Sequence, residues 1–309
     1  MSEQAPSQIG RYRIVGVVGQ WTAGPWTMGW VYRGHDEANR RDVLLKTLSP
    51  SQVNFAPTDT LRWSMEELHL RFRHEAQANA ALAHPNIINV YELGGHEGMP
   101  FIAFERLEGQ SLLQAMGTGI SLKAVLPVML QVLDGLGFMH KMGIIHRDIK
   151  PANIFICSND RTKITGFFLA KLVQANMKGT RPPFFFGTPF YLSPELLRGD
   201  VFDGRSDLFS LGCVLHELVT GSRPFRSEDP KAIFYKVVHE DPEMELIPTG
   251  PEWKRLHDVI TRALQKNPED RYPNAGALRM DLELALKELG ESAAWTPVLS
   301  RGAAGPRMH

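Results

Sequence analysis

The chain has 309 residues, enough for one large domain or for two lobes with separate cores. Its 34 lysine and arginine residues balance 34 aspartate and glutamate residues, so composition gives no argument for binding nucleic acid or an anionic membrane. No apolar run approaches the roughly 20 residues that span a bilayer. The N-terminus lacks a basic region followed by an apolar core, and the two cysteines lie in apolar segments. We expect a soluble, cytoplasmic protein with no membrane span.

The first half of the chain predicts a small sheet. Apolar and β-branched runs bounded by turn residues are typical of strands. Five such runs predict strands at residues 12–18, 29–32, 43–46, 87–92 and 101–104. A glycine-bearing hairpin loop is expected at residues 19–29. A stretch rich in Pro, Ser and Thr, residues 49–63, predicts an inserted loop.

A helix is predicted to begin after Ser64, because Glu67 three residues later completes a capping box. Residues at helical spacing predict its buried face: Leu68, Phe72, Glu75, Asn79 and Leu82. A carboxylate on a buried face is unfavourable unless it is paired. Glu75 therefore requires a cation from another part of the chain.

The second half of the chain is predicted to be helical. Leucine and methionine recur along a long helix that ends near Gly143. Residues 207–220 are apolar nearly all round, which predicts a helix buried at the centre of a lobe. Two further helices are expected near residues 252–267 and 274–289. From Glu291 onward the composition turns to Ala, Gly, Pro and Ser, which predicts a tail.

The most informative stretch runs from Ile144 to Lys171. His146-Arg147-Asp148 is followed by Lys150 and Asn153, so a carboxylate, a cation and an amide lie within a few residues. Two short extended runs follow, joined by a turn at residues 159–160, and a second loop opens at Gly166. This layout brings two loops to one end of a small hairpin, where both can face one ligand.

Residues 146–153 resemble the catalytic loop of eukaryotic-type serine/threonine protein kinases, H-R-D-x-x-x-x-N. Other landmarks of that family follow in its order within residues 11–289, and the whole resembles the bacterial members: Lys46, Glu75, Ser193-Pro194-Glu195, Asp207 and Arg271. The resemblance implies an α+β protein kinase fold of two lobes. The N-lobe is a small antiparallel β-sheet with one helix, and the larger C-lobe is mainly helical.

The resemblance also implies roles for individual residues. Asp148 would accept the proton of the attacking hydroxyl, with Lys150 and Asn153 completing the catalytic set, and Asn153 would hold magnesium. ATP is the implied nucleotide, and its implied binding residues are Lys46, Glu75, Gly29, Val31, Leu44, Glu105, Leu107 and Phe155. In the family, Glu195 and Arg271 form a structural ion pair, and Asp207 steadies the catalytic-loop backbone.

The chain departs from the family at the triplet D-F-G, where it has Gly166-Phe167-Phe168. The aspartate of that triplet is the principal magnesium ligand. Its loss leaves Asn153 as the one candidate ligand, and a neutral amide is a weak ligand for magnesium. We therefore expect magnesium binding to be weak or absent. Phe168 also places a bulky side chain where the family has a permissive glycine.

Two further departures lie around the expected nucleotide. Leu44 stands where the family has alanine against the adenine ring. The glycine loop aligns as Gly24 to Val31 with Trp26 at the middle glycine, or it starts at Gly19 with a five-residue insertion. Trp26 is either an ordinary hairpin tip or an obstruction in the cleft. All these changes act against bound Mg-ATP.

Residues 177–188 take the position of the activation loop. Thr180 is the candidate regulatory phosphosite, and its phosphate could pair with Arg147; the alternative is an ordinary loop threonine. Thr188 matches the substrate-pocket threonine of the family. Three phenylalanines at 184–186 either pack down over the loop or present an apolar patch to a partner.

These observations lead to two hypotheses. The first is a pseudokinase that acts as a signalling scaffold or allosteric regulator through another protein. The second is an active serine/threonine kinase that transfers phosphate with little or no magnesium, since Asp148, Lys150 and Asn153 are all present. Nucleotide binding without turnover is the intermediate case. The expected organisation is a flexible N-terminus (1–9), N-lobe (10–104), hinge (105–109), C-lobe (110–289) and flexible tail (290–309).

Overall fold

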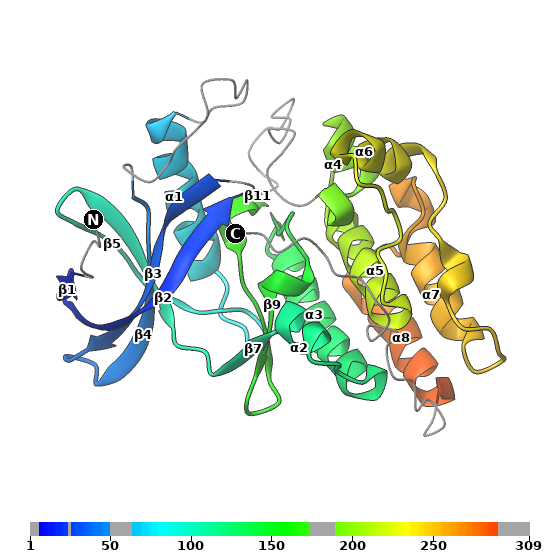
Figure 1. The fold of residues 1–309 in the computed structure, drawn as a ribbon, viewed down its shortest axis with the longest axis horizontal. Helices are drawn as coiled ribbons and strands as arrows, with labels where there is room; N and C mark the ends of the chain where they lie inside the picture. The colour runs from blue at the N-terminus through cyan, green and yellow to red at the C-terminus, as the bar shows by residue number, and fades with distance from the viewer. Residues whose placement is uncertain (1–5, 24–25, 50–63, 173–188, 290–309) are drawn as a thin grey trace.

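The computed structural model describes residues 6–23, 26–49, 64–172 and 189–289. Within these ranges the chain forms the two lobes that the sequence predicts, a β-sheet lobe with one long helix and a helical lobe (Figure 1). The crossing between the lobes follows the end of strand β6 at Glu105 and leads into β7, which begins at Gly109. The space between the lobes is therefore bounded by a sheet on one side and by short loops on the other.

The N-lobe is a six-stranded antiparallel sheet in the order β1-β2-β3-β4-β6-β5. Its strands are β1 (Gln8–Ile9), β2 (Tyr12–Ala23), β3 (Trp26–Asp36), β4 (Arg41–Thr47), β5 (Val90–His96) and β6 (Met99–Glu105). The predicted loop at residues 19–29 is wrong, because backbone pairing continues from Gly19 opposite Val31 to Ala23 opposite Trp26. The fourth strand begins later than predicted. Ile88 instead donates its backbone N–H to Ile164 of the C-lobe.

Helix α1 (Met65–Ala80) packs beside this sheet (Figure 1). Its start confirms the predicted capping box: Glu67 N–H donates to Ser64 Oγ, and Ser64 N–H donates to the Glu67 carboxylate. The predicted buried face is also confirmed, with Leu68, Phe72, Glu75 and Asn79 all buried. The helix thus brings a carboxylate and an aromatic ring toward the space between the lobes.

The C-lobe consists of helices stacked side by side (Figure 1). They are α2 (Leu112–Gly117), α3 (Leu122–Lys141), α4 (Pro194–Arg198), α5 (Arg205–Thr220), α6 (Pro230–His239), α7 (Lys254–Ala263) and α8 (Ala275–Leu289). α5 is buried on nearly every face, as its apolar sequence predicts. α3 has the length and hydropathy of a membrane span, but 56% of its most apolar window is buried inside this lobe. Burial of this kind is typical of a core helix.

Short strands and 3₁₀ turns complete the described chain. The strands are β7 (Gly109–Ser111), β8 (Ile144–Ile145), β9 (Ile154–Cys157), β10 (Thr162–Ile164) and β11 (Lys171–Leu172). The 3₁₀ turns are η2 (Pro151–Asn153), η3 (Phe167–Leu169), η4 (Pro189–Tyr191), η5 (Met244–Leu246) and η6 (Pro268–Asp270). β9 and β10 form the hairpin that the sequence predicts, so the loops ending at Asn153 and opening at Gly166 lie at one end of it.

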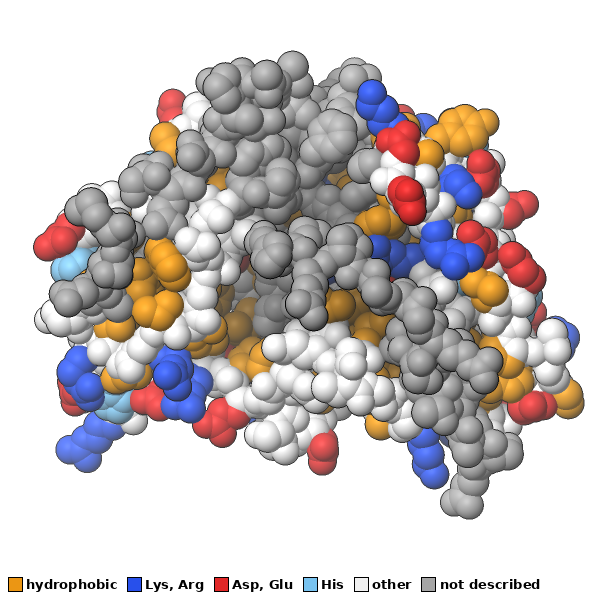
Figure 2. Space-filling model, in the orientation of Figure 1, with side chains coloured by type: hydrophobic (Ala, Val, Ile, Leu, Met, Phe, Trp, Pro, Cys, Tyr) orange, Lys and Arg blue, Asp and Glu red, His pale blue; other side chains and the backbone are white. Residues whose placement is uncertain are grey.

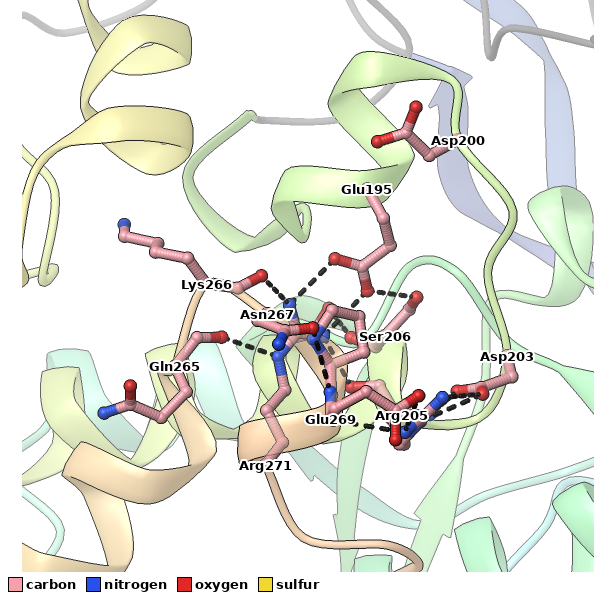
Figure 3. A network of polar contacts seen from close by, with 12 residues as sticks. Glu195, Asp200, Asp203, Arg205, Ser206, Gln265, Lys266, Asn267, Glu269 and Arg271 are labelled. Carbon is pink, nitrogen blue, oxygen red and sulfur yellow. Dashed lines mark hydrogen bonds and ion pairs between the residues drawn. The ribbon is translucent and has the colours of Figure 1, made fainter.

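A buried ion pair holds the C-lobe together (Figure 3). Arg271 Nη1 and Nη2 donate to the two Glu195 oxygens at 2.7 and 2.8 Å, and Ser206 Oγ donates to the same carboxylate at 2.6 Å. The remaining N–H groups of Arg271 donate to backbone carbonyls at Gln265, Lys266 and Arg205. Burial alone would raise the pKa of Glu195, but the hydrogen bonds and charge of Arg271 outweigh burial and lower this pKa. The ion pair predicted from the sequence is confirmed.

Replacing Arg271 with Met should lower the free energy of unfolding by about 3–5 kcal/mol, because Glu195 would stay buried without its cation. Urea unfolding at pH 7 measures this change. The matched control is Arg255→Met, which removes the half-exposed pair with Glu288. That control should lose less than about 1 kcal/mol. Equal losses in the two variants would contradict a structural role for the buried pair.

The unmodified chain and Arg271→Met should also differ in how their free energy of unfolding depends on pH. The folded-state pKa of Glu195 lies below its usual 4.5. The pair therefore contributes its full stability above pH 4.5 and loses it as the pH falls through the lowered value. Arg271→Met lacks this contribution, so its deficit relative to the unmodified chain should shrink as the pH falls below 4.5. A deficit that stays constant over this range would show that Glu195 does not titrate with the pair.

Candidate active site

A cavity of about 770 Å³ lies between the two lobes. Its volume falls in the range typical of small-molecule and cofactor sites. It is lined by the sheet of the N-lobe, the crossing segment, the loop ending at Asn153 and the loop opening at Gly166. A hollow with hydrophobic side chains at its floor is visible between the lobes in Figure 2. The site residues predicted from the sequence are therefore best judged by their position relative to this cavity.

A buried ion pair crosses the N-lobe side of the cavity. Lys46 Nζ on β4 lies 2.8 Å from both carboxylate oxygens of Glu75 on α1. The Glu75 side chain is 2% exposed and that of Lys46 is 12% exposed, so both charges are largely removed from water. This pair satisfies the carboxylate that the sequence leaves on a buried helix face. It also fixes α1 against the sheet.

The catalytic-loop backbone is held from below by Asp207 at the start of α5. Asp207 Oδ1 accepts the backbone N–H of Arg147 at 2.8 Å, and Oδ2 accepts that of His146 at 2.9 Å and the His140 ring at 2.8 Å. Burial would raise the pKa of Asp207, but these partners, led by His140, lower it. Asp207 therefore remains an acceptor for both N–H groups, as the resemblance implies.

His146 is buried and neutral. Burial lowers its pKa despite the nearby charges of Asp207 and Asp148. Its Nδ1 accepts the backbone N–H of Asp148 at 3.2 Å, so Nε2 carries the proton and donates to the carbonyl of Thr165 at 2.9 Å. Phe167 packs edge-on against the ring, with 4.7 Å between centroids. His146 thus links the loop of Asp148 to the loop of Gly166.

The side chains of Asp148, Lys150 and Asn153 form one hydrogen-bonded group beside the cavity. Lys150 Nζ lies 2.8 Å from Asp148 Oδ2, and Asn153 Nδ2 donates to the same oxygen at 2.7 Å and to the Asp148 carbonyl at 2.8 Å. All three residues line the cavity. The carboxylate is therefore placed at the cavity but is already paired with both of its neighbours.

Gly166 has a left-handed backbone, with φ +82° and ψ +42°. Glycine adopts this conformation without steric cost, whereas residues with a Cβ do not. A Cβ built on Gly166 would lie 2.5 Å from Cγ and Oδ1 of Asn153. The Asn153 amide thus fills the space into which a side chain at position 166 would project.

Trp21 is the tryptophan that lines the cavity, and it lies on β2. Its indole Nε1 donates to the carbonyl of Thr47 at 2.7 Å, and Lys46 Nζ lies 3.9 Å from its ring centroid. The ring stacks on Phe72 of α1 at 6.2 Å and meets Phe168 edge-on at 5.1 Å. Each aromatic contact contributes about 0.5–1.5 kcal/mol beyond burial, and a cation over the indole face contributes about 0.5–2 kcal/mol.

Phe168 and Gly29 both accommodate this indole. Phe168 is buried and packs on Trp21, so the bulky residue at the third position of the triplet is part of an aromatic cluster. A Cβ at Gly29 would lie 2.0 Å from the Thr47 carbonyl oxygen and 3.0 Å from Trp21 Nε1. Glycine at position 29 therefore leaves room for the bond between Trp21 and Thr47.

The other predicted nucleotide-binding residues divide into two groups. Val31, Leu44, Leu107 and Phe155 line the cavity with Lys46 and Glu75. Leu44 forms part of the wall, and the cavity persists beside it. Gly29 and Glu105 do not line this cavity. The Glu105 carboxylate turns away to Lys163 Nζ at 2.5 Å and to the backbone N–H of Asn89 at 2.8 Å.

Arg147, predicted as a regulatory residue, is buried beside a second cation. Burial lowers its pKa to about 10, and the charge of Arg71 on α1 adds to this effect. Its guanidinium lies 5.1 Å from the Phe202 ring, and its Nε has no hydrogen-bond partner among the described residues. Thr180, Thr188 and residues 184–186 lie outside the described residues, as does the side chain of Trp26.

The sequence did not predict two features of the site. Asn79, which the sequence places on the buried face of α1, donates Nδ2 to the Glu75 carbonyl at 3.3 Å, while its Oδ1 has no partner within the described part of the chain. Trp21 was missed altogether. The alignment that starts the glycine loop at Gly19 puts Trp21 at the middle glycine, and that was the one available signal.

The family model of the protein kinase domain matches residues 22–282. Curated relatives include a probable serine/threonine-protein kinase of Streptomyces coelicolor, 33% identical over 96% of this chain, and PknB of Mycobacterium tuberculosis, 38% identical over 82%. The chain spans about two-fifths of their length, 42% and 40% respectively. The crystal structure of the PknI kinase domain from Mycobacterium tuberculosis is similar with a TM-score of 0.67 and 26% identity, covering 92% of this chain and 99% of that one.

These matches agree with the contacts of the landmark residues in the structure. The ion pairs of Lys46 with Glu75 and of Glu195 with Arg271 lie where the resemblance implies, and Asp207 holds the loop of Asp148. The fold is the two-lobed protein kinase fold. The chain therefore belongs to the protein kinase family, and the relatives named here are bacterial serine/threonine kinases.

Proposed function

We propose that this chain is a pseudokinase, a protein kinase domain that does not transfer phosphate at a useful rate. The observation that carries the proposal is the position of Gly166. The metal-binding carboxylate of the family is replaced by glycine, and the Asn153 amide fills the space beside it. The proposal therefore concerns the metal site first and the nucleotide second.

The residues around Gly166 do not fit a magnesium ion. Magnesium requires near-octahedral oxygen coordination and usually one or two carboxylates. Among the described residues no group of three or more His, Cys, Asp and Glu side chains is placed to hold a metal. Asp148 is the carboxylate near Asn153, and it is already bonded to Lys150 and to Asn153. We derive no catalytic step through magnesium in this chain.

The energetic consequence is large. A divalent ion contributes several kcal/mol of charge stabilisation in phosphoryl transfer. Each 1.4 kcal/mol corresponds to a tenfold change in rate, so loss of the ion slows the reaction by about a thousandfold or more. Lys46 and Lys150 are the two lysines that line the cavity with Asp148. Each carries one positive charge, whereas a magnesium ion carries two, and each is paired with a carboxylate within 3 Å.

An active kinase that works with little or no magnesium is the second candidate. Two observations favour it: the cavity of about 770 Å³, and the presence of Lys46, Lys150 and Asp148 on its wall. In that case Asp148 would accept the proton of a substrate hydroxyl, and the two lysines would balance the charge of the transferring phosphate. Rate measurements with and without the metal separate the two candidates.

A pseudokinase acts through what it binds. The buried ion pairs, the Asp207 contacts and the packed Phe167 give this domain the internal order of a kinase without requiring turnover. We propose that it serves as a scaffold or an allosteric regulator for another signalling protein. A domain of this kind would report the occupancy of its cavity by a change in the position of α1 and the Gly166 loop.

The first test measures phosphoryl transfer. The purified chain is incubated with labelled ATP and a generic basic protein substrate, in magnesium, in manganese and in EDTA. We expect labelling no greater than that of the matched variant Asp148→Asn, because the metal ligand is missing in both proteins. Labelling more than tenfold above Asp148→Asn in magnesium would overturn the proposal. The same excess in EDTA would support the magnesium-independent kinase.

The second test measures the space beside Gly166. Gly166→Ala should lower the free energy of unfolding by about 2–4 kcal/mol, because a Cβ is strained at positive φ and also overlaps the Asn153 amide. Gly98→Ala is the matched control, since Gly98 has φ +79° and open space around its missing Cβ. That control should lose only about 1–2 kcal/mol. Urea unfolding measures both losses.

A double-mutant cycle assigns the difference. Adding Asn153→Ala to Gly166→Ala removes the overlapping amide, so the double variant should recover at least about 1 kcal/mol of the sum of the two single losses. Additive losses would show that Asn153 does not fill this space. In that case the vacancy left by the family aspartate would be open to another ligand.

A further inference from the structure

We propose that the cleft takes a flat, phosphate-free ligand of the nucleoside class in preference to a nucleoside triphosphate. The reason is Trp21, whose indole lies on the face of Lys46 that a phosphate would need. The inference rests on the proposed function only in that both concern the same cleft. It adds which part of a nucleotide the cleft accepts.

Lys46 is the cation that would meet a phosphate, and its ammonium group is already enclosed. Lys46 Nζ is held by both Glu75 oxygens at 2.8 Å and lies 3.9 Å from the centroid of Trp21. The rings of Phe168 and Phe72 lie at 5.5 and 6.0 Å from the same nitrogen. With 12% of the Lys46 side chain exposed, the ammonium has little surface left for an anion.

The Trp21 indole is held in place by several contacts. Trp21 is fixed by its hydrogen bond to the Thr47 carbonyl, by its stacking on Phe72 and by its edge contact with Phe168. These contacts come from three different elements, β4, α1 and η3. A phosphate that reached Lys46 would have to displace the ring and break all of them. Losing contacts of these strengths lowers the affinity for a triphosphate by at least about tenfold.

The other cations on the cavity wall are mostly paired as well. Lys150 is paired with Asp148 at 2.8 Å, and Arg106 is paired with Glu108 at 3.3 Å. Arg33, the fourth cation on the wall, lies over Gly16 of β2. Three of the four cations are therefore already matched by carboxylates on the same wall. Such a lining gives weak electrostatic attraction for the four negative charges of a triphosphate.

The remainder of the cavity suits an uncharged ring system. Its wall is mainly apolar and is built from both lobes, with Val18, Val31 and Leu44 from the sheet, Leu107 from the crossing segment, and Phe155 and Leu169 from the C-lobe. Apolar side chains on two opposed faces suit a flat ring system, which buries both faces. A nucleoside offers that ring without the charge that Trp21 and the paired lysines reject.

The test is a titration calorimetry comparison of adenosine and ATP, each in EDTA and in magnesium. For the unmodified chain we expect adenosine to bind at least tenfold more tightly than ATP. Trp21→Ala should improve ATP binding at least tenfold and change adenosine binding by less than threefold. The matched control is Trp30→Ala on the same hairpin, because Trp30 packs in the outer cluster of the sheet and does not line the cavity. It should leave the ratio of the two affinities unchanged.

Several outcomes would overturn the inference: equal or tighter binding of ATP by the unmodified chain, no binding of adenosine, or an unchanged ratio in Trp21→Ala. If Trp21→Ala does not fold, Trp21→Leu repeats the comparison, and the ratio for the unmodified chain needs no variant. The result is independent of the phosphoryl-transfer assay. If the chain labels substrate but binds adenosine more tightly than ATP, the result contradicts only the proposed function. If the chain is inactive but binds ATP more tightly than adenosine, the result contradicts only this inference.

Discussion

The arrangement of the cleft between the lobes depends on the ammonium group of Lys46. It lies between the Glu75 carboxylate and the Trp21 indole, and each partner belongs to a different element. A buried charge without partners is costly, and removing one partner of a buried pair typically costs about 3–5 kcal/mol. The position of α1, the conformation of β2 and the shape of the cavity are therefore coupled through one nitrogen atom. Any ligand that competes for this nitrogen must displace an aromatic ring or a carboxylate.

Two departures from the family pattern, Gly166 and Phe168, are accommodated by neighbouring residues in the cleft. Phe168 packs on Trp21, Gly29 leaves room for its hydrogen bond, and the carboxylate missing at Gly166 is matched by the Asn153 amide in the same space. Substitutions that look like separate losses in the sequence are neighbours in the cleft. Each one is compatible with the packing of the others. This mutual fit supports the proposed pseudokinase.

The sequence predicts the fold well and the site only in part. Ordered landmarks locate the lobes, the capping box at Ser64 and the buried face of α1, because these depend on local periodicity and on residue types. Trp21 was beyond such reasoning. Its position at the cleft depends on a strand register that pairs Gly19 with Val31, and local pattern does not fix register across an unusually long hairpin. The left-handed backbone of Gly166 likewise appears only in three dimensions.

The main argument for catalysis is the presence of Asp148, Lys150 and Asn153. Their contacts offer a second, structural reason for their presence. The Asn153 carbonyl accepts the backbone N–H of Thr165 at 2.9 Å and its hydroxyl at 3.2 Å, while the Asn153 amide bonds to Asp148. Lys150 balances the charge of that carboxylate. The Asn153 backbone therefore joins the two loops at the end of the β9–β10 hairpin, while the three side chains bond to one another within the first loop. Because buried polar groups in folded proteins are generally hydrogen-bonded, the contacts among these three side chains also give them a structural role within the loop of Asp148.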